Sequence, residues 1–178
     1  MHILRLVDGA DFPALAAIVN PYIEKTAIHF ATKPATADEL RADWERDRDR
    51  YACYVAVVDG AVAGFAKAMT FRSRPAYQWT AEIGVYVDER HHRKGVARAL
   101  YEKLIATCRA QGFHMLVAGI ALPNDASVQL HEALGFARVG TFPEVGYKFG
   151  AFHDVGFWTL TLSSTKPVGP VTSPAALP

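Results

Sequence analysis

The feature that most constrains this chain is a run in which a strand, a short basic loop and a helix that starts at a glycine follow one another. Apolar residues alternate with others over 79–87 and share one face, comprising Trp79, Ala81, Ile83, Val85 and Val87. This period of two is typical of a β-strand. A helix is expected from about 95 to 111, because one stripe carries Leu100, Leu104 and Cys108, and Gly112 follows.

The loop between these two elements has the composition of an anion site. Backbone N–H groups at a helix N-terminus attract negative charge, and Gly95 lets the backbone approach a ligand closely. Positive charge is added by four side chains, Arg90, Arg93, Lys94 and Arg98. A pyrophosphate is the expected ligand, although a basic loop that only caps the helix is an alternative. The run contains neither GxxxxGK[ST] nor GxGxxG.

The rest of the chain predicts a mixed sheet with helices on its faces. Further strands are expected over 2–7, 54–58, 61–71, 114–121, 136–142 and 152–162, with a tight turn at Asp59-Gly60. Helices are expected after the capping residue Asp11, over 37–50 and over 123–134, and Pro21 is expected to kink or end the first. This order has no internal repeat. It predicts an α+β fold, an α/β layered single domain with a mixed central sheet flanked by helices.

Composition fits one domain and argues against several function classes. We expect the domain over residues 1–162, followed by an extended or disordered proline-rich tail over 163–178. The chain is 51% hydrophobic, too apolar for a disordered protein, and its net charge of +1 argues against binding nucleic acid or membranes through overall charge. Two cysteines without CxxC spacing, no signal-peptide pattern and no long apolar run predict a soluble protein in a reduced, cytoplasmic setting.

The basic loop resembles the acetyl-CoA motif of the GNAT N-acetyltransferase superfamily, written Q/R-x-x-G-x-G/A. In this sequence the motif is His92-Arg93-Lys94-Gly95-Val96-Ala97, so histidine stands at the first position in place of glutamine or arginine. The stretch from Leu122 to Phe136 resembles the second coenzyme-binding segment of that superfamily. The resemblance implies acetyl-CoA as co-substrate, with no metal.

A narrower resemblance, over roughly residues 3–162, is to the phosphinothricin N-acetyltransferases. It is carried by Trp79-Thr80-Ala81-Glu82, by the loop with Arg72, Arg74 and Tyr77, by HEALGF at 131–136, and by His153-Asp154-Val155-Gly156-Phe157-Trp158. The resemblance implies transfer of an acetyl group to the α-amino group of phosphinothricin, methionine sulfoximine or a related small amino acid. Members are usually dimers, so a homodimer is expected.

Acetyl transfer to an amine needs a base, because the free amine is mostly protonated at pH 7. The resemblance places that base at Glu82, which lies mid-strand on the face opposite Trp79 and Ile83. A partly buried carboxylate there would have a raised pKa. A strand glutamate paired with an arginine is the alternative. The superfamily also implies a tyrosine that protonates the leaving thiolate, and Tyr101 matches, although a core tyrosine is equally consistent.

Coenzyme and substrate contacts also follow from the resemblance. It assigns to the coenzyme the strand residues Val85, Tyr86 and Val87, the loop and helix residues Arg93, Lys94, Gly95, Val96, Ala97 and Arg98, and the pair Asn124 and Ser127. Asn124 could instead cap a helix. The expected substrate contacts are Arg72, Arg74 and Tyr77, with Phe30, Trp79 and His131 as pocket walls. Alternatively, the two arginines are a solvated loop and His131 packs between helices.

Two other classes stay open beside this interpretation. The chain could be a general amino-acid or small-amine acetyltransferase, or a non-catalytic acyl-CoA-binding module on the same fold. An acetyltransferase of proteins would need an open peptide groove, which the sequence does not indicate. HEALG is not HExxH, so no zinc site is expected. Cys53 and Cys108 are expected in the core, since direct transfer needs no acyl-enzyme.

Overall fold

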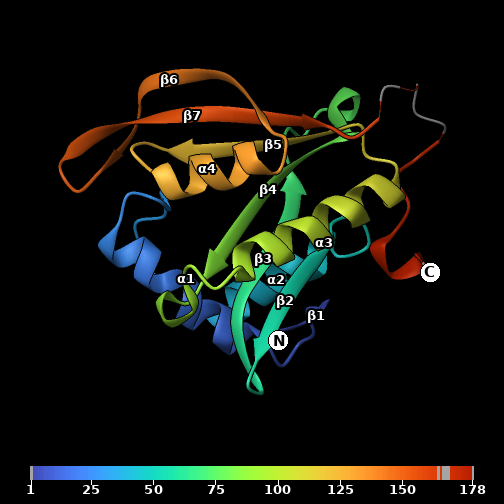
Figure 1. Ribbon diagram of the computed structural model, residues 1–178, viewed down its shortest axis with the longest axis horizontal. Helices are drawn as coiled ribbons and strands as arrows, with labels where there is room; N and C mark the ends of the chain where they lie inside the picture. The colour runs from blue at the N-terminus through green and yellow to red at the C-terminus, as the bar shows by residue number, and fades with distance from the viewer. Residues whose placement is uncertain (1, 164, 166–168, 178) are drawn as a thin grey trace.

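A computed structural model describes residues 2–163, 165 and 169–177 of the chain. Its centre is one seven-stranded sheet in the order β1-β2-β3-β4-β5-β7-β6 (Figure 1). The strands are β1 (Ile3–Leu6), β2 (Cys53–Val58), β3 (Ala61–Thr70), β4 (Thr80–Val87), β5 (Met115–Ala121), β6 (Ala137–Lys148) and β7 (Ala151–Thr161). The helices are α1 (Phe12–Lys25), α2 (Ala37–Asp47), α3 (Val96–Gln111) and α4 (Asp125–Ala133). This arrangement confirms the predicted α+β fold with a mixed sheet.

Pairing between β4 and β5 is the one parallel ladder among the described strands, and it is short. It joins Thr80–Glu82 to residues 115–117, although β4 continues to Val87 and β5 to Ala121. The carboxyl halves of the two strands therefore separate, as Figure 1 shows for β4 and β5. Beyond Glu82, β4 is paired with β3 but not with β5. The sheet thus contains an internal opening.

Helices cover the two faces of the sheet with separate apolar clusters. On one face, α3 contributes Leu100, Leu104 and Cys108, which pack against Ala81 and Ile83 of β4. On the other, α1 contributes Leu15, Val19 and Ile23, which pack against Val55 and Phe65. Alternation in β4 assigns its side chains as the sequence predicts: Ala81, Ile83 and Val87 are buried towards α3, and Tyr86 packs on the α1 side.

The first helix differs from expectation in the role of Asp11 and in continuing past Pro21. Asp11 does not cap α1, because its backbone is already helical and its carboxylate accepts two hydrogen bonds from Arg5, at 2.6 and 2.7 Å. Pro21 does not end the helix, which continues to Lys25. Val19 and Ile23 are each 2% exposed, so the packing on either side of the proline outweighs one lost amide hydrogen bond.

The C-terminal strands are longer than predicted. Instead of two strands with a loop between them, β6 and β7 form one hairpin that turns at Phe149-Gly150, both with positive φ. The register shifts between Phe142 and Gly146, so the intervening residues do not show regular alternation.

The described part of the tail packs against the domain. Gln111 at the end of α3 donates to the Thr172 carbonyl at 2.7 Å and accepts from its N–H at 2.9 Å. Residues 174–176 form a 3₁₀ turn, and Pro174 is buried. Of the tail that was expected to be extended or disordered, residues 169–177 therefore lie against the domain, while residues 164, 166–168 and 178 lie outside the described part.

Candidate active site

Two helix N-termini meet the opening in the sheet. β4 is followed by the eight-residue loop 88–95 and then by α3, and α4 begins four residues after β5 ends. Asn124 caps α4, because its side-chain oxygen accepts from the Ser127 N–H at 3.2 Å. Both strands therefore deliver a helix start to the same edge, where backbone N–H groups are available to a ligand.

Gly95 shapes the start of α3. It is the N-cap residue and has a φ of +78°, a left-handed conformation that glycine adopts without strain. Arg93, two residues earlier, has a φ of +58°. Within the described chain, the backbone N–H groups of residues 93–98 donate to no protein acceptor. A loop that turns in this way presents several free N–H groups to one side, which is how proteins bind phosphate groups.

The charged side chains around this loop fall into two groups, those without an ion-pair partner in the described chain and those paired within the protein. Arg93 and Lys94 are exposed, whereas Arg98 forms an ion pair with Glu102 at 2.8 Å. Arg90 donates to Asp88 at 2.7 Å, and this hydrogen bond lowers the pKa of Asp88 to about 2. Arg90 is therefore used within the protein. Arg93 and Lys94 remain as the cations beside the free N–H groups.

His92, the residue that departs from the superfamily motif, contacts α1. Its Nε2 lies 2.9 Å from the Val87 carbonyl and 2.9 Å from the Tyr22 hydroxyl. Tyr22 itself donates to the same carbonyl at 2.6 Å. His92 thus ties the basic loop to the end of β4 and to the first helix. Tyr22 could not be identified from the sequence, because nothing local to residue 22 signals a partner 65 residues away.

Glu82 lies where the β4–β5 ladder ends. It pairs with Met69 of β3 and is the last residue of β4 to pair with β5. Its side chain is half-buried, and burial raises the pKa of the carboxyl group, while the charge of Arg72 opposes that shift. A carboxylate with a raised pKa at the mouth of an opening can accept a proton near neutral pH.

Tyr101 and His131 form a buried pair between α3 and α4. The Tyr101 hydroxyl lies 3.2 Å from His131 Nε2, and the rings meet edge to face at 5.1 Å. His131 Nδ1 is 2.7 Å from the Ser127 carbonyl, which can only accept, so Nδ1 carries the proton. Tyr101 therefore donates to Nε2. Burial lowers the pKa of His131 and raises the pKa of Tyr101, which keeps both groups neutral at pH 7.

The structure separates the expected substrate contacts into several places. Arg72, Arg74 and Tyr77 lie exposed in the connection from β3 to β4, and the Arg72 charge acts on Glu82. Phe30 lies in the α1–α2 connection against the β6–β7 hairpin. His131 is 2% exposed, so it occupies the core as a packed histidine and is not a pocket wall.

Trp79 is also not at the expected place. Its indole N–H donates to the Gly169 carbonyl of the tail at 3.1 Å. Trp79 stands in the turn before β4, and its indole group therefore contacts the tail in the described chain.

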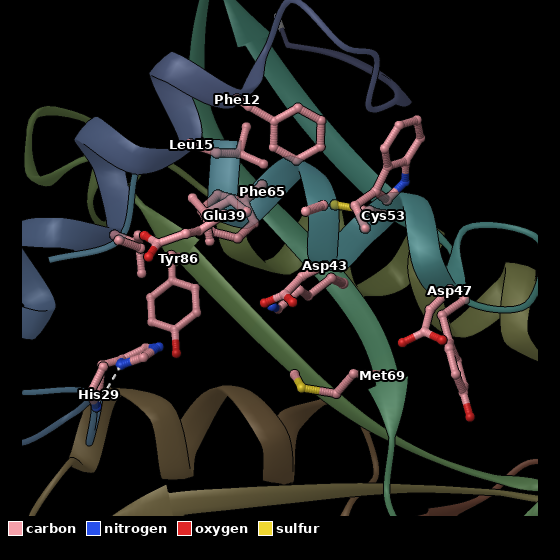
Figure 2. A pocket seen from close by; sticks show the side chains of 18 of the residues that line it. Phe12, Leu15, His29, Glu39, Asp43, Asp47, Cys53, Phe65, Met69 and Tyr86 are labelled. Atoms are coloured by element: carbon pink, nitrogen blue, oxygen red, sulfur yellow. Dashed lines mark hydrogen bonds between the residues drawn. The ribbon is translucent and has the colours of Figure 1, made fainter. Parts of the chain in front are cut away.

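A cavity of about 750 Å³ lies between α1, α2 and the sheet (Figure 2). Phe12, Leu15, Phe65 and Tyr86 form much of its apolar lining, and α2 adds Glu39, Asp43 and Asp47. None of the sequence-predicted substrate contacts lines it. Its links to the site are Met69, the cross-strand partner of Glu82, and the coenzyme candidate Tyr86. Burial raises the pKa of Tyr86 to about 12, so its hydroxyl stays protonated.

Neither cysteine has the properties of a nucleophile. Cys53 and Cys108 are buried and unpaired with each other, and burial raises the pKa of each thiol to about 12. A thiol with that pKa is protonated at pH 7 and unreactive. In the part of the chain that the structure describes, no three His, Cys, Asp or Glu residues gather in a metal-binding group, and no helix is long and apolar enough to cross a membrane.

A parallel pair of strands thus separates beside a half-buried glutamate, next to a helix start whose N–H groups have no acceptor in the described chain. The chain matches the acetyltransferase (GNAT) family over residues 18–136. It belongs to that family.

Two relatives and one solved structure show which members of the family this chain resembles. The chain is 48% identical to a phosphinothricin N-acetyltransferase of Streptomyces viridochromogenes, over 95% of this chain and 94% of that protein. It is 36% identical to an L-methionine sulfoximine/L-methionine sulfone acetyltransferase of Salmonella typhimurium, over 89% of this chain and 94% of the relative. The crystal structure of a GNAT superfamily phosphinothricin acetyltransferase from Sinorhizobium meliloti in complex with AcCoA superposes with a TM-score of 0.91, at 30% identity, covering 96% and 95% of the two chains.

Proposed function

We propose that the protein transfers an acetyl group from acetyl-CoA to the α-amino group of phosphinothricin, methionine sulfoximine or a related small amino acid. The observation that carries the proposal is the position of Glu82 at the end of the short β4–β5 ladder. The names of the 48% and 36% identical relatives support this class of acceptor. The acetyl-CoA complex of the Sinorhizobium enzyme supports the donor.

The residues around the opening fit acetyl-CoA. The free N–H groups of Lys94, Gly95, Val96 and Ala97 would bind the pyrophosphate, with Arg93 beside them and Arg98 on the first turn of α3. Val85, Tyr86 and Val87 lie in the part of β4 that β5 leaves unpaired, and apart from the Val87 carbonyl, which accepts from Tyr22, backbone groups on that edge would bind the amides of the pantetheine arm. Asn124 and Ser127 flank the arm from α4, although the Asn124 oxygen also serves the helix cap.

Glu82 would act as the general base, taking a proton from the acceptor's ammonium group directly or through a water. The neutral amine then attacks the thioester carbonyl carbon, and a C–N bond replaces the C–S bond. A backbone N–H of Val85–Val87 would donate to the carbonyl oxygen as negative charge develops there. The departing thiolate takes a proton, for which we propose Tyr101, and the proton that the nitrogen loses as the amide forms restores the tyrosine hydroxyl.

Tyr101 could supply that proton only if its hydroxyl turned away from His131. The tyrosine is 1% exposed, and its proton is directed at His131 Nε2. What supports the assignment is its position on α3, one turn after the free N–H groups of residues 93–98. The alternative is a structural role in the core, in which Tyr101 joins α3 to α4. Mutation can distinguish this role from that of an acid.

Acceptor selection would come from the exposed β3–β4 connection. Arg72 and Arg74 offer cations to the carboxylate and the phosphinate of the acceptor, and Tyr77 offers a hydroxyl. Phe30, 37% exposed, would form part of the wall on the side of the β6–β7 hairpin. Among the three groups, Arg72 is the one whose charge already acts on Glu82.

The proposal is tested by measuring thiol release from acetyl-CoA with a panel of acceptors. The panel contains phosphinothricin, methionine sulfoximine, methionine sulfone, common amino acids and a polyamine. A strong preference for the first three supports the proposal. Turnover of common amino acids or the polyamine alone would favour a general amine acetyltransferase. Coenzyme binding without any turnover would favour a non-catalytic acyl-CoA-binding module.

We also propose that the protein is a cytoplasmic homodimer whose catalytic domain spans residues 1–162, with 163–178 as a tail. The support for a dimer is a set of exposed apolar side chains on the β6–β7 hairpin, namely Val139, Phe142, Val145, Tyr147, Phe149 and Phe152. Apolar patches of this kind mark protein interfaces. Light scattering after size exclusion should give twice the chain mass of 19.5 kDa, and Phe152→Ser should shift the protein towards monomer.

A further inference from the structure

Lys148, at the end of β6, carries a buried ammonium group with an unusual set of partners. The residue is 5% exposed, and its Nζ donates to three backbone carbonyls. These belong to Ile23 at 2.5 Å, Thr26 at 2.9 Å and His29 at 2.6 Å. An ammonium has three N–H donors, so its hydrogen-bonding capacity is filled. Within the described chain, no carboxylate forms an ion pair with it.

The three carbonyls come from the end of α1 and the segment that follows it. Ile23 lies in the last turn of α1, Thr26 is its C-cap residue, and His29 lies in the connection to α2. Carbonyls at a helix C-terminus lack partners within the helix and carry partial negative charge. Lys148 therefore caps α1 from another element, and it fixes how the chain leaves that helix.

A second contact packs the α1–α2 connection against the β6–β7 hairpin. Phe30 lies over Gly146, where a Cβ would come within 2.4 Å of Phe30 Cζ. Gly146 pairs with His153 of β7, whose ring is 6.1 Å from that of Phe30. His153 Nε2 in turn lies 3.0 Å from the Lys148 carbonyl. The Phe30 ring thus occupies the space that the side chain of any residue other than glycine at position 146 would fill.

The connection also reaches the β4 face that carries Glu82. The His29 ring is 5.7 Å from the ring of Tyr86, which lies four residues after Glu82 on the same face of β4. Burial lowers the pKa of His29, and the charges of Lys67 and Lys148 act in the same direction. Figure 1 shows the α1–α2 connection near the turn of the β6–β7 hairpin. Lys148 is therefore the polar anchor between the hairpin and the segment that carries Phe30.

We propose that Lys148 is a positioning residue for the acceptor: its ammonium holds residues 26–30 so that Phe30 stands against the β6–β7 hairpin as the wall of the acceptor site. This inference rests on the proposed function only in taking Phe30 as an acceptor contact. Lys148 touches neither the acceptor nor acetyl-CoA. Its loss should weaken acceptor binding and leave coenzyme binding unchanged.

The test compares Lys148→Met, which removes the charge and keeps the chain length, with Lys25→Met. Lys25 is an exposed lysine in the last turn of α1 and serves as the matched control. The first readout is hydrogen–deuterium exchange of residues 27–36 in the full chain. The second is the KM for phosphinothricin or the best acceptor of the panel. The third is the Kd for acetyl-CoA.

For Lys148→Met we expect faster exchange in 27–36 and an acceptor KM raised about tenfold, since misplaced binding groups cost up to about 10²-fold. The acetyl-CoA Kd and the behaviour of Lys25→Met should match the unmodified protein. Lys148→Arg should restore part of the protection. Unchanged exchange in Lys148→Met would overturn the anchor, and faster exchange with an unchanged acceptor KM would overturn its role for the acceptor.

A second variant covers the case in which Lys148→Met fails to fold. Gly146→Ala places a methyl group against the Phe30 ring without altering Lys148, and it should raise the acceptor KM in the same way. A normal KM in this variant would contradict the inference. If no acceptor is turned over even by the unmodified protein, the proposed function fails, while the exchange measurement still decides whether Lys148 anchors the connection.

Discussion

The carboxylate of Glu82 on β4 reaches towards Gly119 on β5, where a methyl group built on the glycine would lie 3.7 Å from Oε1. Residues 82 and 119 belong to strands that pair only up to Glu82 and Val117, so this approach occurs where the ladder has ended. The same position lies 3.3 Å from Cε1 of Phe157, so an aromatic ring and the carboxylate both approach the glycine. Glu82 is thus partly buried without a hydrogen-bonding partner among the described residues, the state expected of a base.

Replacing the base should separate catalysis from binding. We expect Glu82→Gln to lower kcat at pH 7 by about 10²-fold or more, since general bases contribute about 10²- to 10⁴-fold. Acetyl-CoA should still bind, which calorimetry can measure. Glu24→Gln, an exposed glutamate of α1, is the control. Equal kcat values for Glu82→Gln and the unmodified protein would remove Glu82 as the base.

The pH dependence should respond to Arg72. Burial raises the pKa of Glu82 and Arg72 opposes that rise, so Arg72→Gln should raise the pKa further. The base is lost as pH falls through this pKa, and the acidic limb of the kcat profile should therefore move to higher pH. Arg109→Gln, an exposed arginine in the last turn of α3, should leave the limb in place. A limb that does not move in Arg72→Gln would show that another group titrates there.

Gly95 and Gly60 allow a matched test of the coenzyme loop. Both have positive φ, +78° and +80°, and both have open space where a Cβ would point. Alanine at either position should cost about 1–2 kcal/mol of stability, because L-residues are strained in this conformation. Gly95→Ala should also weaken acetyl-CoA binding, whereas Gly60→Ala, in the β2–β3 turn, should not. Similar coenzyme affinities for the two variants would contradict a backbone cradle at residue 95.

Tyr101→Phe distinguishes an acid from a core residue. If Tyr101 protonates the thiolate, kcat should fall by about 10²-fold while the melting temperature changes little, since one buried hydrogen bond contributes about 1 kcal/mol. His131→Phe removes the same hydrogen bond from the other side and is the comparison. A Tyr101→Phe protein with normal kcat and lowered stability would leave Tyr101 a structural residue.

The Arg5–Asp11 pair should make stability depend on pH. The hydrogen bond from Arg5 lowers the pKa of Asp11, so its contribution is present above the unfolded pKa and is lost as pH falls through the folded one. Asp11→Asn should therefore lower the melting temperature at pH 7 and have a smaller effect near pH 3. Thermal unfolding followed by circular dichroism at the two pH values measures this. An equal loss of melting temperature at both pH values would mean that the charge of Asp11 is not responsible.

Local patterns were sufficient for much of the fold. The Asp59-Gly60 turn predicted the β2–β3 hairpin, and alternation over 79–87 predicted both β4 and the face on which Glu82 lies. The same alternation includes Trp79, which the structure instead places in the turn before β4. The long β6–β7 hairpin could not be predicted, because the register shift between Phe142 and Gly146 breaks the period of two.

Parts of the candidate site that lie in a local motif could be identified from the sequence. Residues whose place in the site depends on contacts with distant parts of the chain could not. The loop before Gly95 was identified from its own residues, and Glu82 was assigned through the family resemblance and its position in the strand. Lys148 and Tyr22 reach carbonyls 125 and 65 residues away in sequence, and no pattern signals such contacts. The cavity beneath α2 is likewise formed by five separate elements.

The short β4–β5 ladder has a thermodynamic consequence. The two halves of the sheet are joined through three residue pairs at that seam, and the strand edges beyond it offer backbone groups that the protein itself does not pair. A molecule that hydrogen-bonds to both edges completes the sheet in place of a missing strand. Its binding energy then adds to the free energy of unfolding, in proportion to the logarithm of its concentration relative to Kd. In the proposed binding mode, acetyl-CoA would stabilise the folded chain in this way.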